Sequence, residues 1–318
     1  MTTVTAHSNT ALRYVDGATV FRLVPIAKAV EVVRQALLAG LVPRNDPPRS
    51  LVSTHSGQLL LMPSEFDRWV GVKIASVVPG NTAVGRPRVQ AIYVLLDAET
   101  LTPRALIDGN AVTVLRTAAV SAVAVDYLAD PAANRLTVFG TGPQAWAHIQ
   151  SICAVRPIDE VAVVGRDACR TRAFAERVEA EGLNVRLPSV DAVLNADIVL
   201  CATTATEPLF EGKLVAPHAC VVAIGSHEPG VRELDEVLMG VSSVIVEDQD
   251  VALREAGDVI QAVAAGTLHV DDLLGLADVV TGRTSVVRVA PRVFKSVGMS
   301  WEDLVVAVRL FELLEEED

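Results

Sequence analysis

The sequence is poor in residues on which several protein classes depend. Aromatic residues make up only 4% of the 318 residues, and there are only four cysteines, Cys153, Cys169, Cys201 and Cys220. Their spacing does not match the paired CxxC pattern of zinc sites, and four cysteines in a chain of this length are too few for a disulfide framework. We therefore expect no metal site and four reduced, mostly buried thiols.

Positive charge and long apolar runs are also scarce. The chain has 27 Lys and Arg against 39 Asp and Glu, a net charge of -12, which repels nucleic acid and anionic membranes. The longest apolar run, 118–125, is far shorter than the ~20 residues of a membrane span. The first residues lack the basic and apolar segments of a secretory signal. We expect a cytoplasmic protein with neither a nucleic-acid nor a membrane partner.

The middle of the chain has the pattern of a doubly wound sheet. Hydrophobic residues reach 51%, and between residues 134 and 290 short Val/Ile/Leu runs alternate with helical segments. The clearest runs are 136–139, 161–164, 198–201 and 220–224. Continuously apolar strands separated by helices are typical of a parallel sheet covered on both faces. We expect an α/β protein with a Rossmann domain over residues 129–290.

The two ends of the chain predict a second, smaller domain. A helical pattern over 26–39 is followed by strand-like runs at 59–62, 70–78 and 91–97. Near the C-terminus, Ser300 is expected to cap a helix over 301–314, and that helix is too apolar to stand alone. We expect this helix to pack on the N-terminal part of the chain, so that residues 1–128 and 291–318 form one α+β domain.

A glycine-rich loop predicts a dinucleotide site. Residues 140–145 read Gly-Thr-Gly-Pro-Gln-Ala and lie between a predicted strand and a predicted helix. Gly140 permits a tight turn, Gly142 lets a pyrophosphate approach the backbone, and Ala145 allows close helix packing, while the helix N-terminus, including Gln144, supplies N–H donors. A nicotinamide or flavin dinucleotide is the functional interpretation; a tight turn in a ligand-free domain is the alternative.

The end of the following strand bears on the choice of nicotinamide cofactor. It reads Val164-Gly165-Arg166-Asp167. NADP sites place an arginine here for the 2′-phosphate, whereas NAD sites place an acid for the ribose diol. Arg166 favours NADP(H), and NAD(H) remains possible if Asp167 takes the ribose role.

Three cationic residues in the N-terminal part of the chain, residues 1–128, lie in sequence surroundings where a charged side chain is unusual. Lys73 lies inside the apolar run 69–77, so it requires a partner or a shifted pKa. Arg116 begins an almost wholly apolar helix, and Arg49 follows two prolines on a stiff segment suited to a bidentate clamp. We expect Lys73 to face a site that holds a carboxylate or an imine; a lysine reaching water from an edge strand is the alternative.

Several motifs, in order along the chain, resemble those of one family. They are Met62-Pro63, the Lys73 strand with Pro79-Gly80-Asn81, the run 115–119, the Gly140 loop, residues 225–234 and Phe294-Lys295-Ser296-Val297-Gly298. From about residue 49 to 307, this pattern resembles the ornithine cyclodeaminase/mu-crystallin family. The resemblance implies a homodimer in which a substrate-binding and dimerisation domain, built from both chain ends, adjoins a Rossmann domain.

The resemblance also implies roles for single residues. Three would bind the substrate carboxylate near the nicotinamide: Arg49, Lys73 and Arg116. Others would lie near the cofactor: Asn81 and Thr117, together with Ser296 and Gly298 in a loop against the nicotinamide. These cations are the same three that stand out from their sequence surroundings alone.

One departure from the family pattern bears on the reaction. Ornithine cyclodeaminases carry a catalytic aspartate where this chain has His227. Cyclodeamination needs a base at that position, whereas reduction of a C=N bond needs a hydride and a proton donor. We expect an NAD(P)H-dependent reductase of 2-imino acids or cyclic ketimines, an amino-acid dehydrogenase in reverse, with Lys73 and His227 as catalytic residues. The alternatives are an ornithine cyclodeaminase that uses Glu228, and a non-catalytic small-ligand carrier.

Overall fold

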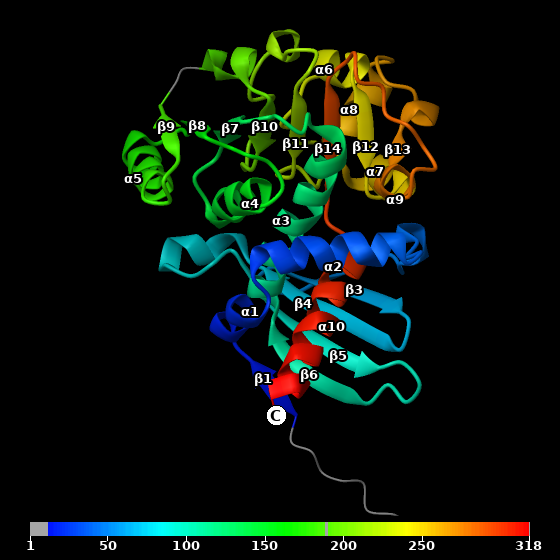
Figure 1. Ribbon diagram of the computed structural model, residues 1–318. Coiled ribbons are helices and arrows are strands. Elements are labelled where there is room, and N and C mark those ends of the chain that lie inside the picture. Colours follow the sequence, from blue (N-terminus) through cyan, green and yellow to red (C-terminus); the bar gives the residue numbers. More distant parts are fainter. Residues whose placement is uncertain (1–11, 188–189, 318) are drawn as a thin grey trace, which may run out of the picture.

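The computed structural model describes residues 12–187 and 190–317, and these form two sheets, one above the other (Figure 1). The lower, six-stranded sheet has the order β1-β6-β5-β4-β3-β2. Its strands are β1 (Arg13–Val15), β2 (Ser50–Ser53), β3 (Gln58–Phe66), β4 (Trp69–Val77), β5 (Val89–Asp97) and β6 (Pro103–Asp108). All neighbours are antiparallel except β1 and β6.

The upper, eight-stranded sheet is parallel throughout, with the order β13-β12-β14-β11-β10-β7-β8-β9. Its strands are β7 (Arg135–Phe139), β8 (Glu160–Val164), β9 (Asn184–Arg186), β10 (Ile198–Cys201), β11 (Cys220–Ala223), β12 (Ser243–Val246), β13 (Leu274–Gly275) and β14 (Arg292–Lys295). The chain leaves β7 for β8 on one side and returns to β10 on the other, and ligands of such sheets bind at that switch point. The expected Rossmann fold is confirmed.

The helices divide between the two sheets. Those of the lower part are α1 (Gly17–Leu23), α2 (Ile26–Leu38) and α10 (Ser300–Glu317); those of the upper part are α4 (Pro143–Cys153), α5 (Ala168–Glu179), α6 (Glu236–Val241), α7 (Gln249–Glu255), α8 (Gly257–Ala264) and α9 (Leu276–Val280). Helix α10 packs on β3 and β4, as expected of an apolar C-terminal helix. Both ends of the chain therefore build the lower part.

Helix α3 (Gly109–Leu128) joins the two parts, because it contacts α2 and α10 below and α4 above. By length and composition alone it is apolar enough to cross a membrane, but 78% of its most apolar window is buried inside the protein. That burial is typical of the core helix of a folded domain, where an all-round apolar surface meets neighbours on every side. Helix α3 thus carries its polar residues into the interior of the molecule.

Two details differ from the sequence expectations. Strand β14 pairs with β11 and β12, so residues 292–295, beyond the expected boundary at 290, belong to the upper sheet. Ser300 is the first residue of α10 rather than its cap; Asp46 accepts a hydrogen bond from the Trp301 backbone at 2.6 Å and caps the helix from the other end of the chain. A cap supplied from a distant segment leaves no local signal in the sequence.

Candidate active site

The glycine loop has the geometry of a dinucleotide cradle. Gly140 has a φ of +120°, and a side chain there would press against the Ala202 carbonyl oxygen at the end of β10. This close approach brings the loop to the switch point between β7 and β10. No described atom lies within 4 Å of where a Gly142 side chain would be, which leaves the backbone open on that side.

The start of α4 fits the pyrophosphate of such a cofactor. Gly142 occupies the cap position without any side-chain hydrogen bond, and Pro143 follows at the first helical position. The free N–H groups at the start of a helix attract an anion. Gln144 Oε1 is buried without a hydrogen-bond partner among the described residues, so this oxygen can accept a hydrogen bond from a bound ligand. The residues present therefore fit a bound dinucleotide.

The end of β8 is the position that distinguishes NAD sites from NADP sites, and here it carries an arginine. Arg166 is exposed directly after β8. The neighbouring Asp167 turns back to cap α5, where Oδ1 accepts a hydrogen bond from the Arg170 backbone at 2.9 Å. A carboxylate engaged in a helix cap is poorly placed to accept from a ribose diol, whereas the Arg166 side chain is exposed.

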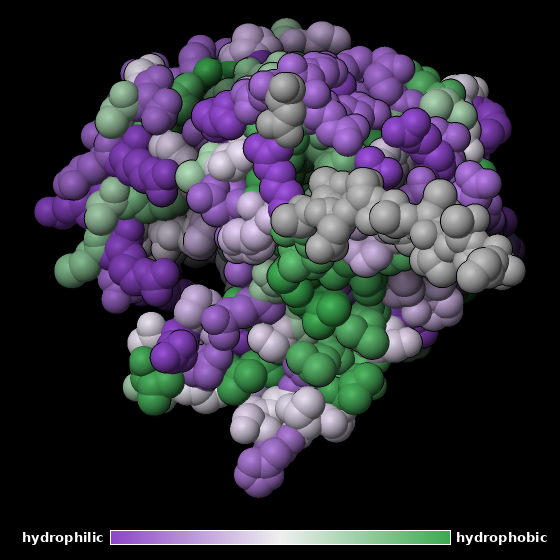
Figure 2. Space-filling model, turned by 90° about the horizontal axis from the view of Figure 1, so that it is seen from below, coloured by the Kyte–Doolittle hydropathy of each residue, from purple (hydrophilic) through white to green (hydrophobic). Residues whose placement is uncertain are grey.

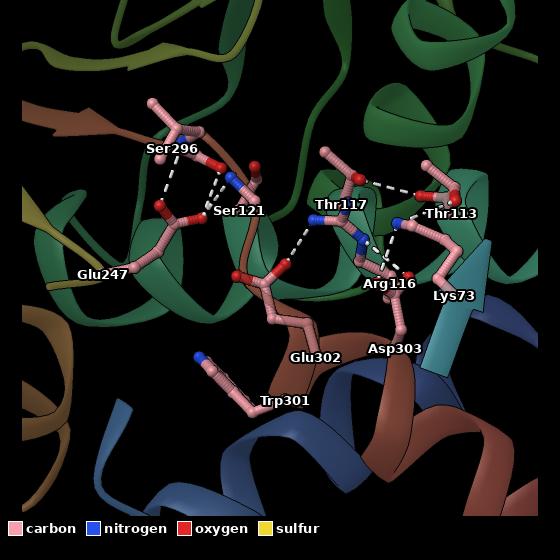
Figure 3. Close-up of polar contacts among 12 residues, drawn as sticks. Lys73, Thr113, Arg116, Thr117, Ser121, Glu247, Ser296, Trp301, Glu302 and Asp303 are labelled. Carbon is pink, nitrogen blue, oxygen red and sulfur yellow. Dashed lines mark hydrogen bonds and ion pairs between the residues drawn. The ribbon is translucent and has the colours of Figure 1, made fainter. Parts of the chain in front are cut away.

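Two of the three expected cations meet below this cradle, in a buried cluster formed by Lys73, Arg116, Glu302 and Asp303, called here the cation cluster (Figure 3). Lys73 Nζ lies 2.8 Å from Asp303 Oδ2, and Arg116 Nε lies 3.1 Å from Asp303 Oδ1. Arg116 Nη1 also lies 2.5 Å from Glu302 Oε2. Lys73 comes from β4, Arg116 from α3 and the two acids from the first turn of α10.

Burial sets the protonation of this cluster. Loss of water lowers the pKa of Lys73 to about 8, although Asp303 favours the charged amine. Burial opposes the charge of Arg116 as well, but Asp303 and Glu302 outweigh it and raise the pKa of Arg116. Arg116 therefore stays charged, whereas Lys73 can exchange a proton near neutral pH.

The surroundings of Glu302 disfavour its charged form. Burial, with the adjacent Glu247 carboxylate, raises the pKa of Glu302 well above its usual range. Glu247 already accepts hydrogen bonds from the Ser296 hydroxyl at 2.6 Å and from the Val297 and Gly298 backbones. Asp303 contacts both Lys73 and Arg116, whereas burial disfavours a negative charge on Glu302. The cluster thus places two cationic side chains in a buried position where an anionic ligand can interact with them.

Arg49 lies near the cation cluster, because it contacts the loop after β14 that packs against Arg116. Its Nη2 donates to the Gly298 carbonyl at 2.5 Å, and its Nε lies 3.1 Å from Glu255. Gly298 has a φ of +73°, and any side chain there would collide with the Arg116 guanidinium. Glycine at this position lets Arg116 lie against the loop, and the structure thereby brings Arg49, Lys73 and Arg116 around Gly298 and the start of α10.

His227 lies at the exposed tip of the loop after β11. Partial desolvation of the ring, with smaller effects of the charges on Lys295 and Arg49, lowers its pKa, while Glu228 opposes this. The imidazole is therefore neutral at pH 7. Arg49 is therefore close enough to His227 for its charge to act on the ring.

The remaining expected residues are engaged within the protein. The Asn81 side chain donates to the Pro87 carbonyl at 3.0 Å, the Thr117 hydroxyl donates to the Thr113 carbonyl at 2.7 Å, and Ser296 is held by Glu247. Thr117 adjoins Arg116, and Ser296 lies in the loop beside it, whereas Asn81 lies in the 3-10 segment Pro79–Val84 and bonds within its own turn.

Sequence reasoning missed the acids that complete the site. Glu302 and Asp303 looked like ordinary first-turn acids of a helix, yet both are fully buried. The available signal was that residues three and four positions after Asp303, Val306 and Ala307, are apolar, which places the carboxylate on the buried face. Glu247 gave no such signal, because it simply follows a strand.

Comparisons with known proteins agree with this arrangement. The family model of the ornithine cyclodeaminase/mu-crystallin family matches residues 18–318. Ketimine reductase mu-crystallin of Rattus norvegicus is 34% identical over 263 residues, which cover 82% of this chain and 82% of the relative.

Two solved structures share the whole architecture. Thermococcus litoralis Delta(1)-pyrroline-2-carboxylate reductase in complex with NADH and L-proline has a TM-score of 0.90 at 28% identity, covering 96% of this chain and 98% of that chain. An archaeal alanine dehydrogenase dimer with bound NAD has a TM-score of 0.89 at 25% identity, covering 96% and 97%. With its two sheets, its glycine loop and its cation cluster, the chain belongs to the ornithine cyclodeaminase/mu-crystallin family.

Proposed function

We propose that this protein is an NAD(P)H-dependent reductase that converts 2-imino acids, cyclic ketimines among them, into amino acids. The observation that carries the proposal is the cation cluster, in which Lys73 and Arg116 are buried side by side and both contact Asp303. Two cationic side chains that converge in a buried site suit the carboxylate of an imino acid. The rat and Thermococcus relatives are a ketimine reductase and a pyrroline-2-carboxylate reductase, which supports the proposal.

The charge of each side chain indicates its role in the reaction. When bound, the nicotinamide supplies the hydride that adds to the C=N carbon. Arg116, which stays charged at all relevant pH values, binds the substrate carboxylate, and Arg49 closes the same side through the Gly298 loop. Lys73, with a pKa of about 8, holds a proton that it can give to the substrate nitrogen. His227, in the loop after β11, is neutral and can accept a proton from the amino acid when the reaction runs in reverse.

The proposal is tested by stoichiometry with purified protein. Pyrroline-2-carboxylate with NADPH or NADH should consume one cofactor per proline formed. L-ornithine without a reductant should yield neither ammonia nor proline, because no aspartate stands at the position of His227. Rapid proline formation from ornithine would instead assign the base role to Glu228 and make the protein a cyclodeaminase. Tight binding of imino acid without cofactor oxidation would make it a carrier.

For the cofactor we propose NADP(H), recognised by Arg166. The guanidinium follows β8 without an ion pair to any described residue, and the nearby Asp167 is occupied by the α5 cap. Arg166→Ala should weaken NADPH binding by about tenfold or more and leave NADH binding almost unchanged, since a lost charge-assisted pair costs about 1.5–3 kcal/mol. Arg172→Ala, at an exposed position of the neighbouring helix α5, is the matched control. Equal losses for both cofactors would assign the protein to NAD(H).

We further propose that the protein is a homodimer joined through the open face of the six-stranded sheet. The helices pack on one face, and on the other face apolar side chains lie in register across the strands: Ile74 pairs with Leu61 and Ile92, and Val72 with Val94. All five are only half-buried. Apolar residues gather on the underside of the molecule, where this sheet lies (Figure 2). An apolar sheet face of this kind is typical of a subunit interface.

A further inference from the structure

A second buried charge network, separate from the cation cluster, lies behind the loop that carries His227. It consists of Glu233, Asp258 and Lys295, called here the Glu233 network. All three side chains are at most 1% exposed. Buried ionised groups are costly unless they are fully paired, so their presence here calls for an explanation.

Glu233 ties two loops together. Its Oε1 accepts hydrogen bonds from the backbone and the hydroxyl of Thr203, at 2.9 and 2.6 Å, in the loop after β10. Its Oε2 accepts from the Gly225 backbone at 2.7 Å, in the loop after β11. A side chain on Gly225 would meet the Thr203 carbonyl oxygen, so the two loops touch above this carboxylate.

The other two members hold Glu233 and the His227 loop from below. Asp258 Oδ1 accepts hydrogen bonds from the Glu233 and Leu234 backbones, both at 2.8 Å. Lys295 Nζ donates to the Ser226 carbonyl at 2.7 Å and lies 3.2 Å from Asp258 Oδ2. Lys295 ends β14, immediately before the loop that contains Gly298.

The His227 loop is closed at its base. The Ser226 hydroxyl donates to the Val231 carbonyl at 2.6 Å. Gly257 at the start of α8 lets the Val231 and Glu228 carbonyls approach closely, since a side chain there would collide with both. The segment 227–230 alone is therefore exposed, and its position is set by Gly225 and Ser226, both of which the Glu233 network binds.

We propose that Glu233 is a positioning residue, which fixes the Thr203 loop at the dinucleotide crevice and the His227 loop beside it at one spacing. Asp258 and Lys295 hold its segment in place. The Thr203 loop follows β10, at the switch point where the cofactor binds, and the His227 loop carries a residue of the proposed reaction. The catalytic part of this inference therefore rests on the proposed function, whereas the coupling of the two loops does not.

Glu233→Gln in the full-length protein is the test, with Glu236→Gln as matched control, because Glu236 lies in the same segment and pairs only with Arg232 at 2.6 Å on the surface. Glutamine keeps the volume but puts an amide nitrogen against one of the two sets of N–H donors. We expect amide exchange of both peptides, 203–205 and 225–231, to rise by about tenfold. We expect kcat to fall by ~10–100-fold, with less than about a threefold change in the KM of the imino acid, since the cation cluster is untouched.

Several results would separate the possibilities. Wild-type exchange of both loops in Glu233→Gln would overturn the inference whether or not the protein is a reductase. Loosened loops together with an inactive wild-type protein would overturn the proposed function and support the coupling. If Glu233→Gln does not fold, Thr203→Val removes one of the three hydrogen bonds to Glu233. It also removes the bond that the Thr203 hydroxyl accepts from the Ala205 backbone at 3.1 Å, so the exchange of the distant peptide 225–231 is the readout in that variant. We expect a smaller rise there; unchanged exchange of 225–231 would overturn the inference.

Discussion

At the scale of single residues, Lys73 combines two properties that are seldom found together. It is held by Asp303 at 2.8 Å and by Thr113 at 3.2 Å, so its position is fixed. Burial nevertheless lowers its pKa to about 8. A fixed amine that can release its proton near neutral pH has the properties of a general acid.

The pH dependence of turnover should follow this lysine. Because the active form is the protonated amine, kcat should be constant below pH 8 and fall above it. Lys73→Met should lower kcat by ~100-fold and abolish that alkaline fall. The pKa of Lys73 in the folded protein lies below its value of 10.5 in the unfolded chain. The contribution of Lys73 to the free energy of unfolding therefore rises as the pH increases from 8 to 10.5. Alkaline loss of activity with undiminished melting temperature is the expected signature.

Lys73→Arg is the control, because an arginine keeps the charge but does not lose its proton in this range. It should retain substrate binding while its activity no longer falls above pH 8. An alkaline fall that persists in both variants would assign the titration to another group.

The cations of the site could be predicted from sequence, but their partners could not. Lys73 and Arg116 stand in apolar surroundings, which already indicates that each needs an acid. Asp303 lies 187 positions after Arg116, and no local pattern joins residues so far apart. The strand, turn and helix around the glycine loop were predictable because they follow one another directly in the sequence, whereas the contact of Gly140 with the Ala202 carbonyl was not.

At the scale of elements, helix α10 depends on a residue from the opposite end of the chain. Asp46 accepts hydrogen bonds from Ser64 at 2.5 Å and from the Trp301 backbone at 2.6 Å. It therefore ties β3 to the first turn of α10, where Glu302 and Asp303 lie. Burial raises the pKa of Asp46 to about 6, so the carboxylate is charged at neutral pH.

Asp46→Ala should affect both stability and binding. Loss of the cap should lower the free energy of unfolding at pH 7 by about 1–2 kcal/mol, measured by urea denaturation. The KM of the imino acid should rise, because the turn that holds Asp303 is loosened. Asp16→Ala is the matched control: Asp16 caps α1 on the surface through the Thr19 backbone at 2.8 Å. It should reduce stability and leave KM unchanged, and equal KM values in the two variants would contradict the proposed link.

Four strands of the upper sheet, β7, β8, β10 and β11, were predicted within a residue, whereas β9, β13 and β14 and the order of the strands were not. The runs 136–139, 161–164 and 198–201 correspond to β7, β8 and β10, because a strand buried on both faces reads as an unbroken apolar segment. Strand β14 lies between β11 and β12 although it is the last strand in the chain. Such insertion depends on contacts between distant segments, for which a short apolar run carries no information.

At the scale of the whole molecule, the open sheet face should determine the oligomeric state. Ile74→Asp places a charge at the centre of that face and should convert a dimer into a monomer, measured by light scattering after size-exclusion chromatography. Val237→Asp is the control, since Val237 is 47% exposed in α6 on the upper part. A wild-type monomer, or an Ile74→Asp protein that remains dimeric, would place the interface elsewhere or exclude it.

The distance in sequence between Arg116 and Asp303 also has a consequence for how the protein is made. At about 5–20 residues per second, the ribosome adds the 187 residues between them in roughly 10–40 s. During that time Arg116 has neither of its acids, because Glu302 and Asp303 belong to α10. We therefore expect Arg116 to remain in water in the nascent chain, and the lower part of the molecule to close only after α10 has been made.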